Sequence, residues 1–330
     1  MMTMDALIAG FSKQIEEALT ISSAYSYKLP KDTVFANIVI SGLGGSGIGG
    51  SIIQNYALHT VSKPIFVNKT YDLPKFANQQ TLVIICSYSG NTEETVEALH
   101  QAIANNCKIV CITSGGAVQS IADQHQLDCI LIPSGFPPRS CLGYSLVQLF
   151  GVFHYFNLID ASFIADFKEA IALLDTEEEA IKAYTKNLAS ALADKLPILY
   201  IENDMEGVGV RWRQQLNENA KMLAWHHVIP EMNHNELVGW RTKDNSKAVV
   251  FLRNETDHVR SQSRMKLNRT TIQDYSATIV DIFSKGNSYV ARAVYLIHLG
   301  DWLSWYLAQE RNFDATEVEV IDKLKSSLAN

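Results

Sequence analysis

The chain has 330 residues, of which 47% are hydrophobic and 19% charged, a composition typical of a globular protein and not of a disordered one. Its length predicts about two domains, each with a buried core. The 28 basic and 35 acidic residues give a net charge of −7, without any cluster of lysine and arginine. We therefore expect no nucleic-acid partner, whereas a small anionic ligand is compatible with this balance because it responds to the local charge of its site.

Three features of the sequence predict a cytoplasmic protein. Residues 1–19 form an amphipathic pattern with internal charges and lack the apolar core and cleavage site of a signal peptide. No stretch is long enough to span a membrane. The cysteines form no CxxC pair, so buried free thiols explain them better than disulfides or a zinc site. They are Cys86, Cys107, Cys111, Cys129 and Cys141.

Short apolar runs alternate with helical patterns in the first half of the chain. The runs are typical of buried parallel strands and cover residues 37–41, 64–68, 81–87, 108–113 and 129–133. Helices predicted at about residues 50–60 and 93–105 connect them into βαβ units. The first half is therefore expected to be a doubly wound α/β domain.

The second half repeats this organisation after a helical stretch at residues 143–195. Strands are predicted at residues 197–202, 247–253 and 278–283, followed by a long helix at about residues 288–311. We therefore expect two doubly wound parallel-sheet domains, residues 1–150 and 151–330. NIVISGLGGSGIGGSIIQ and PILYIENDMEGVGVRWRQQ are each a strand, spaced glycines and a helix, a weak sign of an internal repeat.

A glycine-rich segment at residues 42–50 follows the first strand, and six of its nine residues are glycine. Glycines allow a ligand to approach the backbone, and a helix N-terminus offers unpaired N–H groups to phosphate. The segment also matches the dinucleotide-binding pattern G-x-G-x-x-G. That pattern expects an acidic residue at the end of the second strand, where Asn68 stands, so an NAD-dependent oxidoreductase is the weaker interpretation.

A serine-rich segment at residues 87–95, SYSGNTEET, follows the third strand and opens a helix. The hydroxyls of Ser87, Ser89 and Thr92 are spaced to converge with backbone N–H groups on one phosphate. The simpler interpretation makes Thr92 a helix N-cap, with two glutamates in the first turn. Both interpretations are compatible, and the Ser-x-Ser-Gly before the cap favours phosphate binding. Residues 113–116 close the next strand and are expected to line the same cleft.

These segments resemble a known family. GLGGSGIGG, SYSGNTEET and ITSGG, in this order, resemble the sugar isomerase (SIS) domain. Further along, PRSCLGY, QLNENAK, PEMNHNE and IDKLK resemble the bifunctional phosphoglucose/phosphomannose isomerases. The resemblance spans nearly the whole chain. The first three motifs indicate only SIS, and the later four indicate the subfamily.

The resemblance implies a homodimer of two-SIS-domain subunits with shared active sites, a sugar 6-phosphate substrate, and no metal or coenzyme. It implies phosphate contacts at Gly45, Ser46, Ser87, Ser89 and Thr92. It also implies a catalytic set in which Arg139 lies beside the reacting carbons, Glu218 is the base, His234 of the neighbouring subunit opens the ring and Lys325 lies near the ring oxygen.

Residue chemistry alone leaves alternatives to these roles. Glu218 by itself would be a solvated glutamate on a helix face, and only the surrounding pattern makes it a base. Arg139 follows two prolines, which suits either a fixed anion contact or a structural ion pair. Lys325 lies near the chain end with Lys323, which is the functional lysine if the helix register differs.

Two further points bear on the reaction. His226, His227 and His234 have no recognised metal-ligand spacing, so metal binding is disfavoured and His234 suits a polar loop or a surface position. Val318 stands where some family members have a threonine linked to the mannose epimer, so glucose 6-phosphate activity is better supported than mannose 6-phosphate activity. A non-catalytic SIS-type sensor of sugar phosphates is the alternative function, although no DNA-binding helix-turn-helix is evident.

Overall fold

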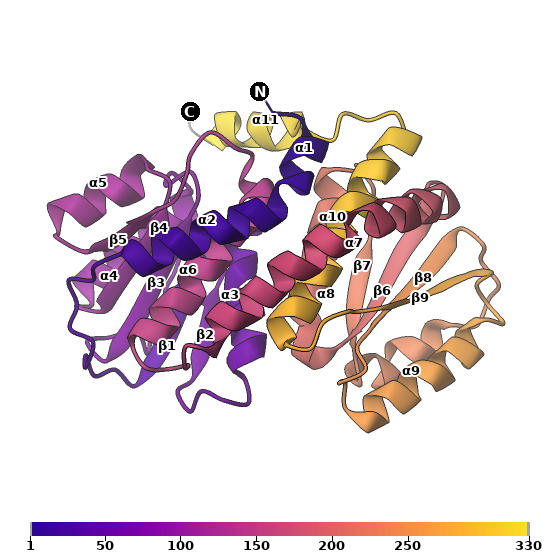
Figure 1. Ribbon diagram of the computed structural model, residues 1–330, viewed down its shortest axis with the longest axis horizontal. Coiled ribbons are helices and arrows are strands. Elements are labelled where there is room, and N and C mark those ends of the chain that lie inside the picture. Colours follow the sequence, from indigo (N-terminus) through magenta and orange to yellow (C-terminus); the bar gives the residue numbers. More distant parts are fainter. Residues whose placement is uncertain (1, 329–330) are drawn as a thin grey trace.

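The computed structural model describes residues 2–328, which form two fully parallel sheets with helices between and around them (Figure 1). The first sheet contains β1 (Asn37–Ser41), β2 (Ile65–Asn68), β3 (Thr81–Ser87), β4 (Lys108–Thr113) and β5 (Asp128–Leu131), in the order β2-β1-β3-β4-β5. The second contains β6 (Leu196–Glu202), β7 (Trp225–Ile229), β8 (Lys247–Arg253) and β9 (Thr278–Phe283), in the order β7-β6-β8-β9.

Eleven α-helices occur in the described residues. They are α1 (Met4–Ala9), α2 (Phe11–Ala24), α3 (Gly44–Ala57), α4 (Glu93–Ala104), α5 (Gly116–Gln124), α6 (Leu142–Tyr155), α7 (Ser162–Leu192), α8 (Glu206–Glu218), α9 (Val259–Ile272), α10 (Tyr289–Glu310) and α11 (Glu319–Leu328). Short 3-10 turns are η1 (Pro138–Ser140), η2 (Asn203–Met205), η3 (Glu231–His234) and η4 (Glu236–Gly239). The doubly wound α/β fold class predicted from the sequence is confirmed.

Alternation along the strands divides the apolar side chains between two faces of each sheet. Ile38 and Ile40 of β1 join Leu199 and Ile201 of β6 in one continuous core, which the central helices fill. Val39 lies in a smaller core under α4 and α5, and Ile198 in another beside α9. The two halves therefore share their largest core. Because residue 150 lies within α6, the domain boundary proposed there stays a prediction.

Several predicted strands match the structure residue for residue, namely 37–41, 81–87, 108–113, 247–253 and 278–283. Three elements were missed: α5, the weakly amphipathic α9, and β7, a half-buried edge strand with the polar sequence WHHVI, which has no apolar run. β5 ends at Leu131, two residues earlier than predicted, and the N-terminal helix is interrupted at Gly10.

The glycine-rich segment is less of a loop than the sequence suggested. α3 begins at Gly44, about six residues before the predicted start, so most of its glycines are helical. A Cβ on Gly47 would lie 2.2 Å from the carbonyl oxygen of Gly42, and a Cβ on Gly50 would lie 2.9 Å from Ile40. Tight packing on β1 therefore overrides the low helix propensity of glycine here.

The two segments that echo each other in sequence lie against each other in space. α3 and α8 pack together, and Gly207 of α8 comes so close to α3 that a Cβ would lie 3.0 Å from Ile52. The glycines of the second segment therefore allow helix packing between the halves.

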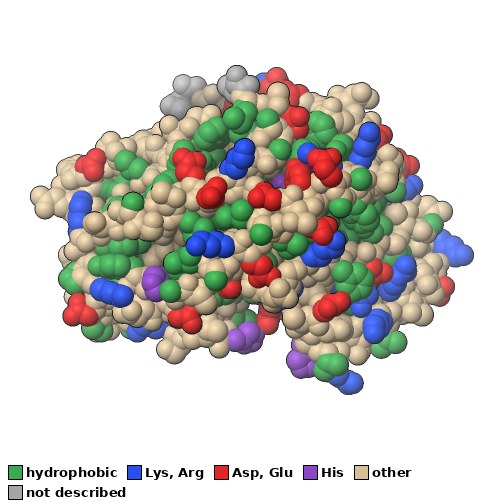
Figure 2. Space-filling view, in the orientation of Figure 1, with side chains coloured by type: hydrophobic (Ala, Val, Ile, Leu, Met, Phe, Trp, Pro, Cys, Tyr) green, Lys and Arg blue, Asp and Glu red, His purple; other side chains and the backbone are tan. Residues whose placement is uncertain are grey.

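Surface and cysteine properties follow the sequence-based expectations. All five cysteines are free, and burial raises the pKa of the Cys86 thiol to about 12, so this thiol is protonated at neutral pH. Acidic and basic side chains are interspersed over the face shown in Figure 2. In the described part of the chain, no helix is long and apolar enough to cross a membrane.

A substitution in the central helices tests the shared core. Gly300 of α10 lies against Trp212 of α8, where a Cβ would come within 2.6 Å of the indole nitrogen. Gly300→Ala should destabilise the fold by about 1–3 kcal/mol, because overpacking outweighs the gain in helix propensity. Urea unfolding measures this change, with Gly239→Ala as the control because a Cβ there has nothing within 4 Å. Equal or greater stability of Gly300→Ala would show that the core adapts freely.

Candidate functional site

The N-terminus of α3 and the segment after β3 lie together at the carboxyl end of the first sheet. Ser46, in the first turn of α3, accepts a hydrogen bond through Oγ from the backbone N–H of Tyr88 at 2.9 Å. Parallel strands β1 and β3 are neighbours, so their carboxyl ends bring the two predicted phosphate segments to one place. The structure thus joins segments that are separated by some forty residues in sequence.

Ser87, Ser89 and Thr92 occupy one turn before α4. The buried Ser87 donates through Oγ to Thr92 Oγ1 at 3.2 Å, and Ser89 Oγ accepts from the N–H of Asn91 at 3.2 Å. Thr92 occupies the N-cap position of α4, but its side chain makes no capping hydrogen bond. The N-cap interpretation is therefore right about the position of Thr92 and about the two glutamates in the first turn, and the phosphate interpretation stays a prediction.

Residues 113–116 and the start of α5 hold this turn in place through hydrogen bonds and close packing. Ser114 donates through Oγ to the carbonyl of Tyr88 at 2.6 Å, and Asn91 Oδ1 accepts from the N–H of Ala117 at 3.0 Å. Gly90 has a φ of +68°, and a Cβ there would lie 1.8 Å from the carbonyl oxygen of Gly115. Only glycine fits this position, because both the conformation and the contact exclude a side chain.

Arg139 connects the phosphate segments to the second half of the molecule. Its backbone lies against α3, where a Cβ on Gly45 would be 3.1 Å from Arg139 Cα. Its guanidinium, with the residue only 3% exposed, donates through Nε to Asn219 Oδ1 at 2.7 Å. Burial lowers the pKa of Arg139, and the nearby carboxylate of Glu218 opposes this shift. The arginine therefore lies between the first sheet and the end of α8.

Glu218 is the last residue of α8, and its carboxylate lies 3.7 Å from the guanidinium of Arg139. The side chain is 27% exposed, so it is neither a solvated surface group nor a sealed core residue. It lines a cavity of about 320 Å³ with Lys221, Val318 and Ile321, among others. The carboxylate therefore reaches the cavity from beside a fixed cation.

The other two predicted catalytic residues lie apart from this group. Lys325 is on α11, every residue of which is exposed, and Lys323 is exposed on the same helix. His234 is exposed at the end of η3. In residues 2–328 no contact is recorded that joins either Lys325 or His234 to Glu218.

The position of His234 follows from the two faces of the second sheet. α8 packs on the face formed by Leu199 and Ile201, whereas Met232 of η3 belongs to the core on the opposite face. Glu236, two residues after His234, accepts a hydrogen bond from Tyr200, whose ring also lies on that opposite face. The sheet therefore separates the helix that carries Glu218 from the segment that carries His234.

The histidines do not converge on a metal. His226 lies 3.5 Å from Glu206 on the α8 side of β7, whereas its neighbour His227 bonds Glu236 at 2.7 Å on the other side. In residues 2–328 no group of three or more histidine, cysteine, aspartate or glutamate side chains is placed to hold a metal ion. Asn68, where a dinucleotide site would need an acid, donates to Ser41 Oγ at 3.3 Å.

Sequence reasoning missed the residues that hold Arg139 in place. The fully buried Asn219 bonds Arg139 through its oxygen and donates through its nitrogen to Ser304 Oγ at 2.9 Å. Arg211 donates to the carbonyl of Arg139 at 2.7 Å and pairs with Asp301 at 2.9 Å. Asn219 stands inside the QLNENAK motif and could have been found there, whereas Arg211 and Asp301 carried no sequence signal.

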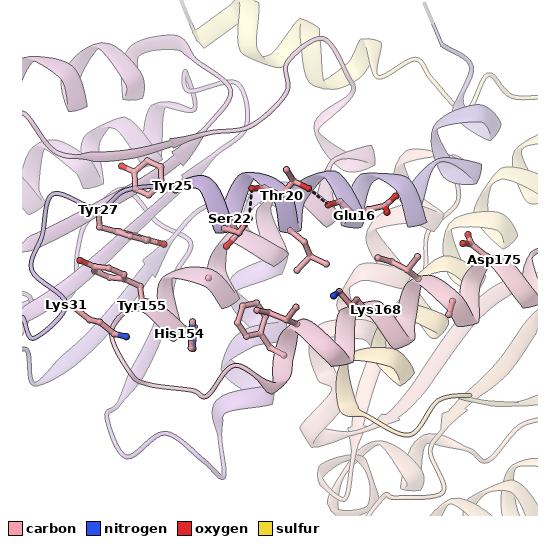
Figure 3. A pocket seen from close by; sticks show the side chains of 17 residues that line it. Glu16, Thr20, Ser22, Tyr25, Tyr27, Lys31, His154, Tyr155, Lys168 and Asp175 are labelled. Atoms are coloured by element: carbon pink, nitrogen blue, oxygen red, sulfur yellow. Dashed lines mark hydrogen bonds between the residues drawn. The ribbon is translucent and has the colours of Figure 1, made fainter.

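A cavity of about 970 Å³, larger than the one beside Glu218, lies elsewhere, between α2, α6 and α7 (Figure 3). The rings of Tyr27 and Tyr155 are stacked at one end, with their centroids 3.8 Å apart. Lys168 and Asp175 lie toward the other end. None of the predicted site residues lines it. Cavity size therefore does not identify the functional site of this molecule.

Comparison with known proteins identifies the family of this chain. A family model described as the bacterial phospho-glucose isomerase C-terminal SIS domain matches residues 181–328, and the SIS domain model matches residues 36–134. The bifunctional phosphoglucose/phosphomannose isomerase of Caldicellulosiruptor bescii is 39% identical over 329 residues, covering 96% of each chain. That of Aquifex aeolicus is 35% identical over 299 residues, covering 90% of this chain and 91% of the relative. The chain belongs to the bifunctional phosphoglucose/phosphomannose isomerase family.

This membership confirms the family predicted from the sequence motifs and gives no support to the sensor alternative. The solved structure of tagatose-6-phosphate ketose/aldose isomerase from Escherichia coli superposes with a TM-score of 0.73 at 16% identity, covering 96% of this chain and 95% of that one. At this identity the likeness shows the SIS-type fold alone.

The support around Arg139 can be tested directly. Asn219→Ala removes a buried partner from a buried cation and should destabilise the fold by about 1–3 kcal/mol. Asn217→Ala, in the last turn of α8 and exposed, is the control; it loses one hydrogen bond to the carbonyl of Met222 and should cost less than about 1 kcal/mol. Urea unfolding of both variants makes the comparison, and equal losses would contradict the role assigned to Asn219.

Proposed function

We propose that this protein interconverts glucose 6-phosphate and fructose 6-phosphate, and also mannose 6-phosphate and fructose 6-phosphate. The observation that carries this proposal is the placement of Arg139, whose backbone packs against Gly45 of the first predicted phosphate segment and whose guanidinium lies 3.7 Å from Glu218. The names of the relatives support both sugar substrates. A phosphate held at one end and a carboxylate base with an arginine at the other are what aldose–ketose isomerisation requires.

In the proposed reaction Glu218 moves a proton between C1 and C2 through a cis-enediolate, and Arg139 stabilises the developing negative oxygen. Gly45, Ser46, Ser87, Ser89 and Thr92 hold the phosphate. His234 opens the sugar ring, and Lys325 lies near the ring oxygen. No metal or coenzyme takes part in this scheme, because the proton transfer and charge stabilisation are assigned to side chains.

The preference between glucose 6-phosphate and mannose 6-phosphate is proposed to depend on a residue that lines the cavity beside Glu218. Val318, where some family members have threonine, lines the cavity beside Glu218. An apolar valine offers no hydrogen bond to a sugar hydroxyl, so we propose that glucose 6-phosphate is used better than mannose 6-phosphate. Comparing kcat/KM for the two aldoses in the same preparation tests this point, and a preference for mannose 6-phosphate would contradict it.

We propose a homodimer in which each active site takes His234 from the neighbouring subunit. Two observations support it. The second sheet stands between α8 and the segment carrying His234. α11 also presents apolar side chains to solvent, with Val320 81% and Leu324 60% exposed, near Leu223 at 80%. A partner subunit that covered this surface would bury it.

We also propose a cytoplasmic location, which the five free thiols support. Fractionation of the native cells would contradict it if the protein were found outside the cytoplasm.

The activity and its base are tested by one assay. Purified protein should convert fructose 6-phosphate to glucose 6-phosphate, detected by a coupled enzyme, with equal rates with and without EDTA. Glu218→Gln should lower kcat by at least about 10²-fold while leaving KM similar, since only the proton acceptor is lost. Absence of turnover in the wild-type protein would overturn the isomerase proposal. Loss of activity with EDTA would overturn the metal-free scheme, and an active Glu218→Gln variant would overturn the assignment of Glu218 as the base.

Shared active sites are tested with mixed dimers. Glu218→Gln and His234→Ala chains, co-expressed with different tags, give a heterodimer in which one site is doubly defective and the other intact. If His234 acts across the interface, this heterodimer should show about half the wild-type kcat although each parent is inactive. If His234 acts within its own subunit, the heterodimer stays inactive. Light scattering on the purified protein checks the dimer itself.

A further inference from the structure

Three consecutive backbone carbonyls between α10 and α11 accept hydrogen bonds from two cations. Arg139 donates to the carbonyls of Ala315 at 2.6 Å and Thr316 at 2.8 Å. Lys221 donates through Nζ to the carbonyl of Glu317 at 2.7 Å. The segment that leads into α11 is therefore held by side chains that also lie beside Glu218.

Lys221 is the second of these cations and lies just after α8. Its ammonium donates to the carbonyl of Glu218 at 2.6 Å and lies 3.3 Å from the carboxylate of Glu317. With the carbonyl of Glu317, these acceptors match the three donors of an ammonium. One side chain thus caps the C-terminus of α8, where carbonyls lack helical partners, and ties it to the segment before α11.

The backbone conformation of Lys221 is unfavourable for lysine, which indicates that the contacts of its side chain stabilise this position. Its φ is +52°, in the left-handed region that glycine or asparagine adopts after a helix at less cost. A lysine here carries the full conformational cost of this region. The benefit comes from the three contacts of the ammonium, whose side chain is 19% exposed.

α11 depends on this attachment. Every residue of α11 is exposed, its least exposed large apolar side chain being Ile321 at 40%, so packing within the described chain holds this helix only weakly. The cavity of about 320 Å³ lies between the two tied segments, with Glu218 and Lys221 on one and Val318 and Ile321 on the other. Loss of the tie would widen this cavity and move α11 relative to Glu218.

We propose that Lys221 is a positioning residue, which fixes Glu218 against the segment 315–317 and so sets the width of the reaction cavity. This inference rests on the proposed function, in which Glu218 is the base and α11 carries Lys325. It requires no contact between Lys221 and the substrate. Because the phosphate segments are built from other elements, Lys221 should influence the geometry of proton transfer more than the binding of substrate.

Lys221→Met tests the inference in the full-length protein, since methionine keeps much of the length of the side chain and removes the donors. It should lower kcat for fructose 6-phosphate by about tenfold or more, with KM changed less than about twofold, and should raise hydrogen exchange in residues 318–322. Lys221→Arg, which keeps the charge, should recover part of kcat. The control is Lys266→Met on α9, an exposed lysine away from the site, which should match the wild-type protein.

The outcomes separate this inference from the proposed function. A kcat within twofold of wild type in a folded Lys221→Met would overturn the positioning role while leaving the isomerase proposal intact. An inactive wild-type protein or an active Glu218→Gln would overturn the proposed function instead. If Lys221→Met does not fold, the Glu317→Gln variant tests the positioning role instead, because it removes only the carboxylate partner of Lys221. It should lower kcat a few-fold at constant KM, and an unchanged kcat would contradict the inference.

Discussion

The buried guanidinium of Arg139 is the interaction on which the candidate site depends. A cation that is 3% exposed is costly unless polar partners surround it, and here they come from two separate parts of the chain. Asn219 at the end of α8 accepts from Nε, and the carbonyls of Ala315 and Thr316 accept from one terminal nitrogen. These segments therefore stay together, because moving any one of them away would leave the buried charge of Arg139 without a partner.

The central helices make this arrangement possible. α3 and α8 pack together where glycine replaces a side chain, and α7 and α10 lie alongside as the longest helices of the described chain. Since one apolar core runs from the first sheet to the second, the two halves cannot rotate freely about a hinge. The proposed site lies across their junction, with the phosphate-binding segments from one half and the carboxylate from the other. The shared core would consequently hold it in one geometry.

The same architecture explains why one subunit looks incomplete. Glu218 lies beside Arg139, whose backbone packs on Gly45 of α3, but the second sheet stands between α8 and His234, and α11 leaves Val320 and Leu324 largely exposed. These two observations have one explanation in the proposed dimer, in which a neighbour supplies the histidine and covers α11. The catalytic residues would then fall into an internally fixed group and a group positioned by assembly.

The sequence by itself determined the α/β class, most strands to the residue and the family, and it predicted the two phosphate segments. Buried parallel strands are runs of apolar residues, and phosphate turns need glycine and serine, so both leave a local pattern. Tertiary structure decided what has no local pattern. β7 is an edge strand whose histidines face opposite sides, and α3 is helical because its glycines fit against β1. Arg211, Asn219 and Lys221 act through partners from about 70 to 96 residues away, which only folding brings near.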